Sequence, residues 1–85
     1  MNDDLLADTL KILRDTLRLG PSAVGMNAST RLLGGLPEFD SMAVVSVLTA
    51  LEEHHGIAFE DEEMRAESFE TVATLVSLLE AKLAS

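Results

Sequence analysis

Apolar residues at helical spacing are the feature of this sequence that most constrains its fold. Near the C-terminus, apolar side chains recur every three or four residues, at Phe69, Val72, Val76, Leu79 and Leu83. This spacing predicts one apolar face of an α-helix, because a helix turns once in about 3.6 residues. Ser68 lies just before this run and is expected to cap the helix. Such a helix is stable only if other elements cover its apolar face.

Two further segments show the same periodicity. The first stripe consists of Leu6, Leu10, Leu13 and Leu17 and is widened by Leu5, Thr9 and Ile12. The second consists of Val44, Val47, Leu48 and Leu51. The expected N-cap of the first helix is Asn2 or Asp3. The expected N-cap of the second helix, over about residues 41–55, is Asp40. Gly20-Pro21 is expected to end the first helix and Gly56 the second. No segment alternates as a β-strand would.

The connections are less regular than the three helical segments. Residues 20–39 are rich in Gly, Pro, Ser and Asn but include several large apolar residues, which should attach this loop to the core. We expect a short helical turn at "STRLL" and a short acidic helix over residues 60–66. The sequence therefore predicts an all-α protein, a small three- to four-helix bundle with a long first loop, formed by residues 1–85 as one domain.

The charge of the chain argues against several classes of partner. Its formal net charge is −9, with six acids and four bases in residues 1–40 and nine acids and two bases in residues 41–85. Such a surface repels nucleic acid and anionic membranes and attracts basic protein partners. The N-terminus lacks the basic and apolar regions of a signal peptide, and no apolar run is long enough to span a bilayer. We expect a monomeric, cytoplasmic protein without membrane insertion.

The sequence contains no recognisable set of catalytic residues. There is no cysteine, and the histidines, His54 and His55, lie more than three helical turns beyond Ser41 on the same predicted helix. No G-x-S-x-G turn surrounds a serine. The acidic stretch "EDEEMRAE" lacks the alternating ligands and central glycine of a calcium loop. We therefore expect a solvated or docking face and no metal site, with loose divalent binding as the alternative.

Ser41 follows Asp40 at the start of the second predicted helix. Taken locally, Asp40 is a helix cap and Ser41 is an ordinary first-turn residue. In its context, however, the chain resembles the acyl carrier protein family over nearly its whole length. The resemblance rests on the triplet Asp40-Ser41-Met42, on "ALEEHHGI" at the end of the second helix and on the C-terminal "SFETVATLVSLLEAKL". In that family an Asp-Ser-Leu motif carries 4′-phosphopantetheine on the serine, and here Met42 replaces the leucine.

The resemblance implies a carrier that other enzymes act on, and not an enzyme. A phosphopantetheinyl transferase would attach the cofactor to Ser41 from coenzyme A, and Asp40 would help to position the serine and the transferase's metal. The cofactor's thiol would then hold an acyl or aminoacyl group as a thioester. Family members often shelter the acyl chain between helices. Met42, Val45 and Leu51 are candidates for such a lining, although an ordinary core role explains them equally well.

The second helix also carries candidate partner-binding residues. The positions two and five after the serine are the neutral Ala43 and Ser46, while Glu52 and Glu53 keep acids at the helix end; Met64 is a further candidate. The stretch "LLGGLPEFDSMAVVSVLTALEE" resembles specialised stand-alone bacterial carriers of exosortase and exopolysaccharide systems. This implies acyl- or aminoacyl-activating ligases and acyltransferase-type enzymes as partners. A carrier of general fatty acid synthesis and an unmodified helical interaction module remain the alternatives.

Overall fold

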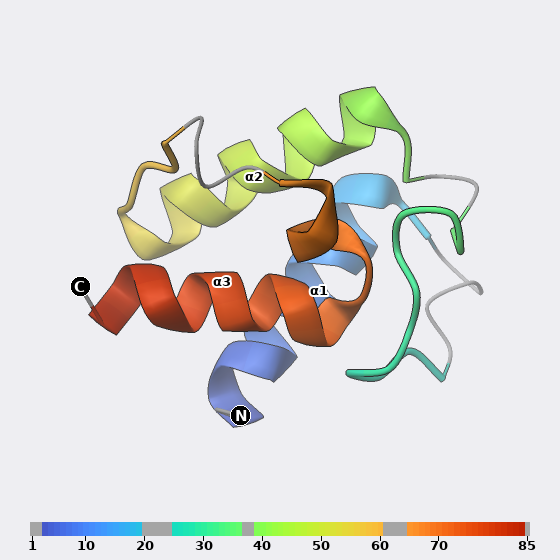
Figure 1. The fold of residues 1–85 in the computed structure, drawn as a ribbon, viewed down its shortest axis with the longest axis horizontal. Coiled ribbons are helices and arrows are strands. Elements are labelled where there is room, and N and C mark those ends of the chain that lie inside the picture. The colour runs from blue at the N-terminus through green and yellow to red at the C-terminus, as the bar shows by residue number, and fades with distance from the viewer. Residues whose placement is uncertain (1–2, 20–24, 37–38, 61–64, 85) are drawn as a thin grey trace.

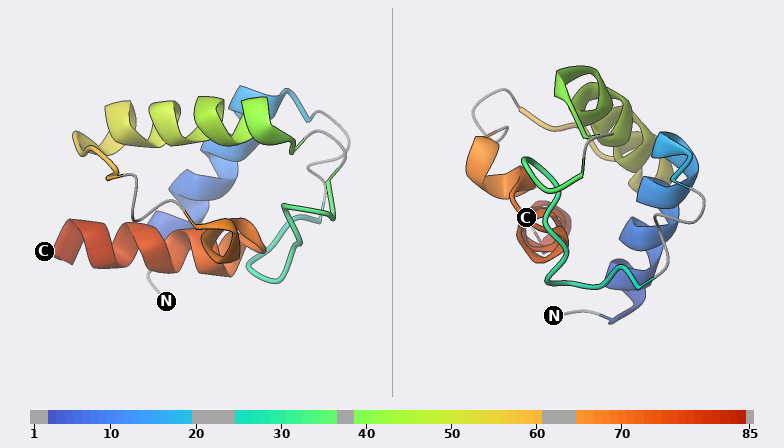
Figure 2. Two further views of the ribbon diagram at one scale, coloured as in Figure 1. Left: turned by 45° about the horizontal axis from the view of Figure 1, so that its top comes forward. Right: turned by 90° about the vertical axis from the view of Figure 1, so that its right-hand side faces the viewer.

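The computed structural model describes residues 3–19, 25–36, 39–60 and 65–84. Three α-helices follow one another in this part of the chain: α1 (Asp3–Leu17), α2 (Ser41–His55) and α3 (Val72–Ala84). A single-turn 3-10 helix, η3 (Ala66–Phe69), precedes α3. Helices α2 and α3 run in the same general direction, and α1 crosses and packs against both (Figures 1 and 2). The predicted all-α bundle with a long first loop is confirmed.

Buried residues of all three helices form one core. In α3 these are Val72, Leu75, Val76 and Leu79, whereas Leu83, the last residue of the predicted stripe, is 44% exposed. In α2, Val47, Leu48 and Leu51 are buried, as their spacing predicted. In α1 the most buried residues are Leu5, Thr9 and Leu13, so the buried face is rotated slightly from the predicted leucine stripe. The buried Thr9 hydroxyl donates a hydrogen bond to the Leu5 carbonyl at 2.7 Å, which satisfies it.

Two predictions about helix ends are wrong. Helix α1 ends at Leu17, where Arg18 adopts a left-handed conformation (φ 52°) and the Leu19 amide bonds the Arg14 carbonyl at 3.1 Å. The helix therefore ends before Gly20-Pro21, which lies outside the described residues. At α3, Ser68 belongs to η3 and does not cap the helix.

Thr71 takes the capping role at α3. The Thr71 amide donates to Oγ1 of Thr74 at 3.0 Å, and the Thr74 amide donates back to Oγ1 of Thr71 at 3.2 Å. This reciprocal pair resembles a capping box in which threonine replaces the usual glutamate or glutamine. The Thr74 hydroxyl also lies 3.0 Å from the Ser68 carbonyl, which ties the start of α3 to η3.

The long first loop is attached to the start of α3 by backbone hydrogen bonds. The amides of Leu32 and Leu33 donate to the carbonyls of Glu70 and Phe69, at 2.8 and 3.0 Å. In return, the Val72 amide donates to the Thr30 carbonyl at 3.0 Å, and Leu32 is fully buried. The loop is therefore held to the core as predicted. The expected helical turn at "STRLL" is wrong, because residues 31 and 71 form an isolated antiparallel bridge there and a non-helical turn follows.

The prediction of an acidic helix over residues 60–66 is not tested over its whole length, because residues 61–64 lie outside the described part. Within the predicted range, Glu60 and Arg65 are not helical, and Ala66 is the first residue of η3. Among the described helices, none combines the length and the apolar character that crossing a bilayer requires.

Candidate functional site

Ser41 is the first residue of α2, and its side chain is exposed. The preceding residue, Asp40, has extended backbone angles (φ −105°, ψ −172°) and accepts the Ala43 amide at 2.9 Å through Oδ1. The Asp40 carbonyl accepts the Val44 amide at 3.0 Å, which is the first hydrogen bond of the helix. This geometry confirms that Asp40 caps α2. It presents the Ser41 hydroxyl to solvent at the positive end of the helix dipole.

An apolar pocket of about 310 Å³ borders Ser41. Its lining comes from α2, from the first loop and from η3, and comprises Leu33, Ser41, Val44, Val45, Leu48, Ala66 and Phe69. The hydrogen bond from the Leu33 amide to the Phe69 carbonyl holds the loop side and the η3 side of this pocket together. Ser41 is the one hydroxyl-bearing residue of this lining, which is otherwise wholly apolar.

Of the three residues that were predicted from the sequence to line an acyl-chain site, one lines the pocket and two do not. Val45 lines the pocket. Met42 is 75% exposed and is not among the lining residues, and Leu51 is fully buried in the core away from the pocket. Val44 and Leu48 were missed, although they follow Ser41 by three and seven residues and so share its helix face. Leu33 and Phe69 reach the pocket only through the packing of distant segments.

The candidate partner-binding residues also differ in their surroundings. Ser46 and Glu53 are exposed, whereas Ala43 is only 7% exposed and faces the core. Glu52 is half-buried, and its Oε2 accepts the Phe59 amide at 2.8 Å, so that carboxylate holds the connector after α2. Met64 lies outside the described residues. The first turn of α2 contains no acidic residue, and among the described residues near Ser41 the exposed large apolar side chains are Met42 and Val45.

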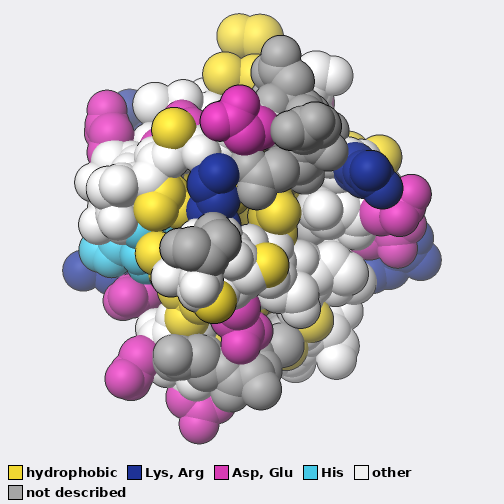
Figure 3. Space-filling view, turned by 60° about the vertical axis from the view of Figure 1, so that its left-hand side comes forward, with side chains coloured by type: hydrophobic (Ala, Val, Ile, Leu, Met, Phe, Trp, Pro, Cys, Tyr) yellow, Lys and Arg dark blue, Asp and Glu magenta, His cyan; other side chains and the backbone are white. Residues whose placement is uncertain are grey.

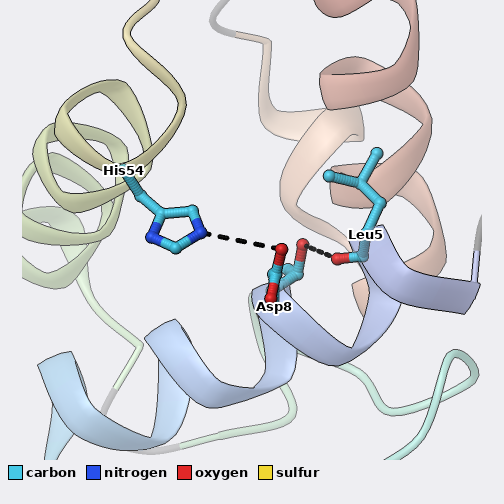
Figure 4. Close-up of polar contacts among 4 residues, drawn as sticks. Leu5, Asp8 and His54 are labelled. Carbon is cyan, nitrogen blue, oxygen red and sulfur yellow. Dashed lines mark hydrogen bonds and ion pairs between the residues drawn. The ribbon is translucent and has the colours of Figure 1, made fainter.

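The two histidines lie at the opposite end of α2 from Ser41, about 20 Å away at the helical rise of about 1.5 Å per residue. His54 Nε2 is 3.6 Å from Asp8 Oδ2, a contact that joins α2 to α1 (Figure 4). The His55 ring stands edge-on to the His54 ring, and burial lowers the pKa of His55, with a smaller contribution from the charge of His54. Neither imidazole can therefore act as a base for Ser41.

The side chains do not suggest a metal site. No group of three or more potential metal-ligating side chains occurs among the residues that the structure describes. On the face shown in Figure 3, Asp and Glu side chains are spread around the histidines and small apolar areas. Such separated carboxylates give a general negative potential and no single ligand set.

Comparisons with known proteins agree with this geometry. A family model described as "Phosphopantetheine attachment site" matches residues 4–79. Among solved structures, the chain is similar to the solution NMR structure of a holo acyl carrier protein from Nitrosomonas europaea, with 45% sequence identity and a TM-score of 0.86. That match covers 94% of this chain and 96% of the other. A comparison with curated proteins found no match.

Proposed function

This chain belongs to the phosphopantetheine-binding acyl carrier protein family, and on that premise we propose that Ser41 is the residue that carries the cofactor. Membership makes the protein a carrier and not an enzyme, with covalently attached 4′-phosphopantetheine as its cofactor. When attached, this group supplies a thiol that holds an acyl group as a thioester.

The observation that carries the proposal is the position of Ser41 at the start of α2. Its hydroxyl is exposed, as a separate transferase requires, and it borders the apolar pocket. A phosphodiester there would be an anion beside a helix N-terminus. Amide groups of the first turn lack partners within the helix, and they and the helix dipole stabilise negative charge. The residues around Ser41 therefore fit the cofactor.

The apolar pocket beside Ser41 suits the non-polar part of a cargo. Val45 and Leu48 from α2 face Phe69 and Leu33 across a space of about 310 Å³. An alkyl chain that enters this space leaves water, which contributes about 0.8 kcal/mol for each buried CH₂ group. We therefore include sheltering of a short acyl chain in this pocket in the proposed function.

The surface around Ser41 favours a specialised pathway over general fatty acid synthesis. Met42 and Val45 are exposed, Ser46 is neutral, and the first turn of α2 has no acid. An apolar, neutral patch selects partners by shape more than by charge. The proposed partners are a phosphopantetheinyl transferase, an acyl- or aminoacyl-activating ligase and acyltransferase-type enzymes, acting on a monomer in the cytoplasm. Elongation of chains on this protein by general fatty acid enzymes at ordinary carrier rates would contradict the specialised pathway.

Intact-protein mass spectrometry tests the attachment residue. The chain is incubated with coenzyme A and a broad-specificity phosphopantetheinyl transferase, and we expect a mass gain of one phosphopantetheine. Ser41→Ala should show no gain. Ser77→Ala is the matched control, since it removes an exposed serine hydroxyl from α3, and it should be modified like the wild type. If several transferases leave the wild type unmodified, an unmodified interaction module becomes the better interpretation.

A further inference from the structure

Helix α1 carries a positive stripe on an otherwise acidic protein. Lys11, Arg14 and Arg18 follow one another at intervals of three and four residues, so they share one face, and all three are exposed. The chain has six Lys and Arg residues in total and a net charge of −9. Half of its cations therefore lie along this one face, where they oppose the general negative potential.

A groove of about 290 Å³ lies beside this stripe. It is lined by Ala7, Leu10, Lys11, Arg14 and Met26, from α1 and the first loop. Leu10 and Met26 are partly buried and pack against the core, so their remaining surface contributes apolar area to a lining that also contains Lys11 and Arg14. The groove shares no residue with the pocket beside Ser41. A ligand in this groove therefore does not occupy the pocket beside Ser41.

The two cations of the groove are available to an external carboxylate. The structure records no hydrogen bond or ion pair of the Lys11 side chain within the described residues. Arg14 Nε is 3.5 Å from Asp15 Oδ1, with both side chains more than half exposed. An exposed pair of this kind contributes little, so it does not prevent Arg14 from binding a partner. Asp8, another acid of α1, is directed at His54 (Figure 4).

We propose that this groove is a second docking surface, which binds an acidic segment of another protein. An apolar side chain of that segment packs on Leu10 and Met26, and its flanking carboxylates pair with Lys11 and Arg14. Charge complementarity favours this occupant, because the residues that line the groove include two cations and no acid. A second copy of the chain is a poorer occupant, since each copy carries a charge of −9. The carrier thus has two surfaces of different chemistry.

Nuclear magnetic resonance titration with a synthetic acidic peptide tests this surface. The probe is a short capped peptide of glutamates with two leucines, and most of the protein surface repels it. We expect its addition to shift the signals of Ala7, Leu10 and Met26, and added salt to weaken the effect. A peptide with serines in place of the leucines should bind more weakly. Equal binding of the two peptides, or an absence of shifts in the groove, would overturn the proposal.

Charge variants provide the matched comparison. Lys11→Gln combined with Arg14→Gln should weaken binding of the peptide about three- to tenfold, because two exposed charge contacts are lost. Arg65→Gln removes an exposed cation outside the groove and should leave binding unchanged. All these side chains are exposed, and circular dichroism checks that the variants fold. Equal affinity of the double variant and the wild type would refute the role of the two cations. Shifts of the groove signals on raising the protein concentration alone would identify a second copy as the occupant instead.

Discussion

Asp40 combines two roles that a pair of substitutions can separate. Its carboxylate accepts the Ala43 amide at 2.9 Å and so caps α2, and its charge lies next to the proposed attachment residue, Ser41. Asp40→Ala removes both the hydrogen-bond acceptor and the charge. Asp40→Asn removes the charge but keeps an oxygen that can accept the same amide. The two variants therefore differ mainly in the capping hydrogen bond.

The expected loss of stability follows from the cap geometry. Replacing an N-cap aspartate by alanine costs about 1 kcal/mol, and Asp40 is itself exposed, so no packing loss is added. In a domain of this size, about 1 kcal/mol lowers the melting temperature by roughly 4–8 °C. Asparagine caps about as well as aspartate and loses only the charge–dipole interaction. We therefore expect Asp40→Asn to lose at most half as much stability as Asp40→Ala.

Two measurements check this reasoning. Urea unfolding followed by circular dichroism gives the free energy of unfolding, and equal losses in the two variants would show that the capping hydrogen bond is not what stabilises α2. Mass spectrometry then gives the rate of cofactor attachment at a temperature where both variants are folded. We expect both to be modified more slowly than the wild type, since both lack the charge. An unchanged rate in Asp40→Asn would refute a role for that charge in positioning Ser41.

Three further predictions concern stability and pH. Leu51→Ala removes a fully buried side chain and should cost about 2–5 kcal/mol in urea unfolding, and a loss below about 1 kcal/mol would contradict its place in the core. Gly35→Ala would place a Cβ 2.5 Å from the Arg31 Cβ and should lower the free energy of unfolding by about 1–3 kcal/mol. A Cβ at Gly34 would have no neighbouring atom within 4 Å, so Gly34→Ala should lose only about 1 kcal/mol through the backbone strain of φ +82°. Because burial lowers the pKa of His55 in the folded state, the unfolded chain binds the proton more readily. The contribution of His55 to stability is therefore complete above its ordinary pKa and falls as the pH drops from about 6.5 through the folded-state pKa. Across this pH range, the free energy of unfolding of His55→Gln should fall less steeply with decreasing pH than that of the wild type. Identical slopes in the two proteins would rule out the effect.

Local chemistry determined the elements that the sequence predicted correctly. The stripes on α2 and α3 depend on residues within a few turns of one another, and the Asp40 cap depends on an amide three residues away. Interactions of such short range can be inferred from spacing alone. The class of protein was also predicted from the sequence, because the triplet at the proposed attachment residue Ser41, the end of the second helix and the C-terminal segment together resemble one family.

The predictions of local structure that were wrong concern positions where contacts with a distant segment determine the conformation. Ser68 was expected to cap α3, but it is part of η3, and Thr71 and Thr74 cap the helix instead. Residues 31 and 71 form a bridge where a helical turn was expected, because the loop amides bond to carbonyls near the start of α3. Local propensity favours several conformations in such segments, and long-range hydrogen bonds select one of them.

The sequence by itself determined three helices, an acidic surface and a serine at the start of the second helix, because each depends on composition or on close spacing. Only the tertiary structure decided which side chains surround that serine. Met42, two places before the pocket residue Val44, points to solvent, while Phe69 and Leu33 reach the pocket from other segments. Likewise, Met26 meets Lys11 and Arg14 only because the loop passes beside α1. A pocket or groove is a property of surfaces that packing brings together, and helical periodicity describes only one of those surfaces at a time.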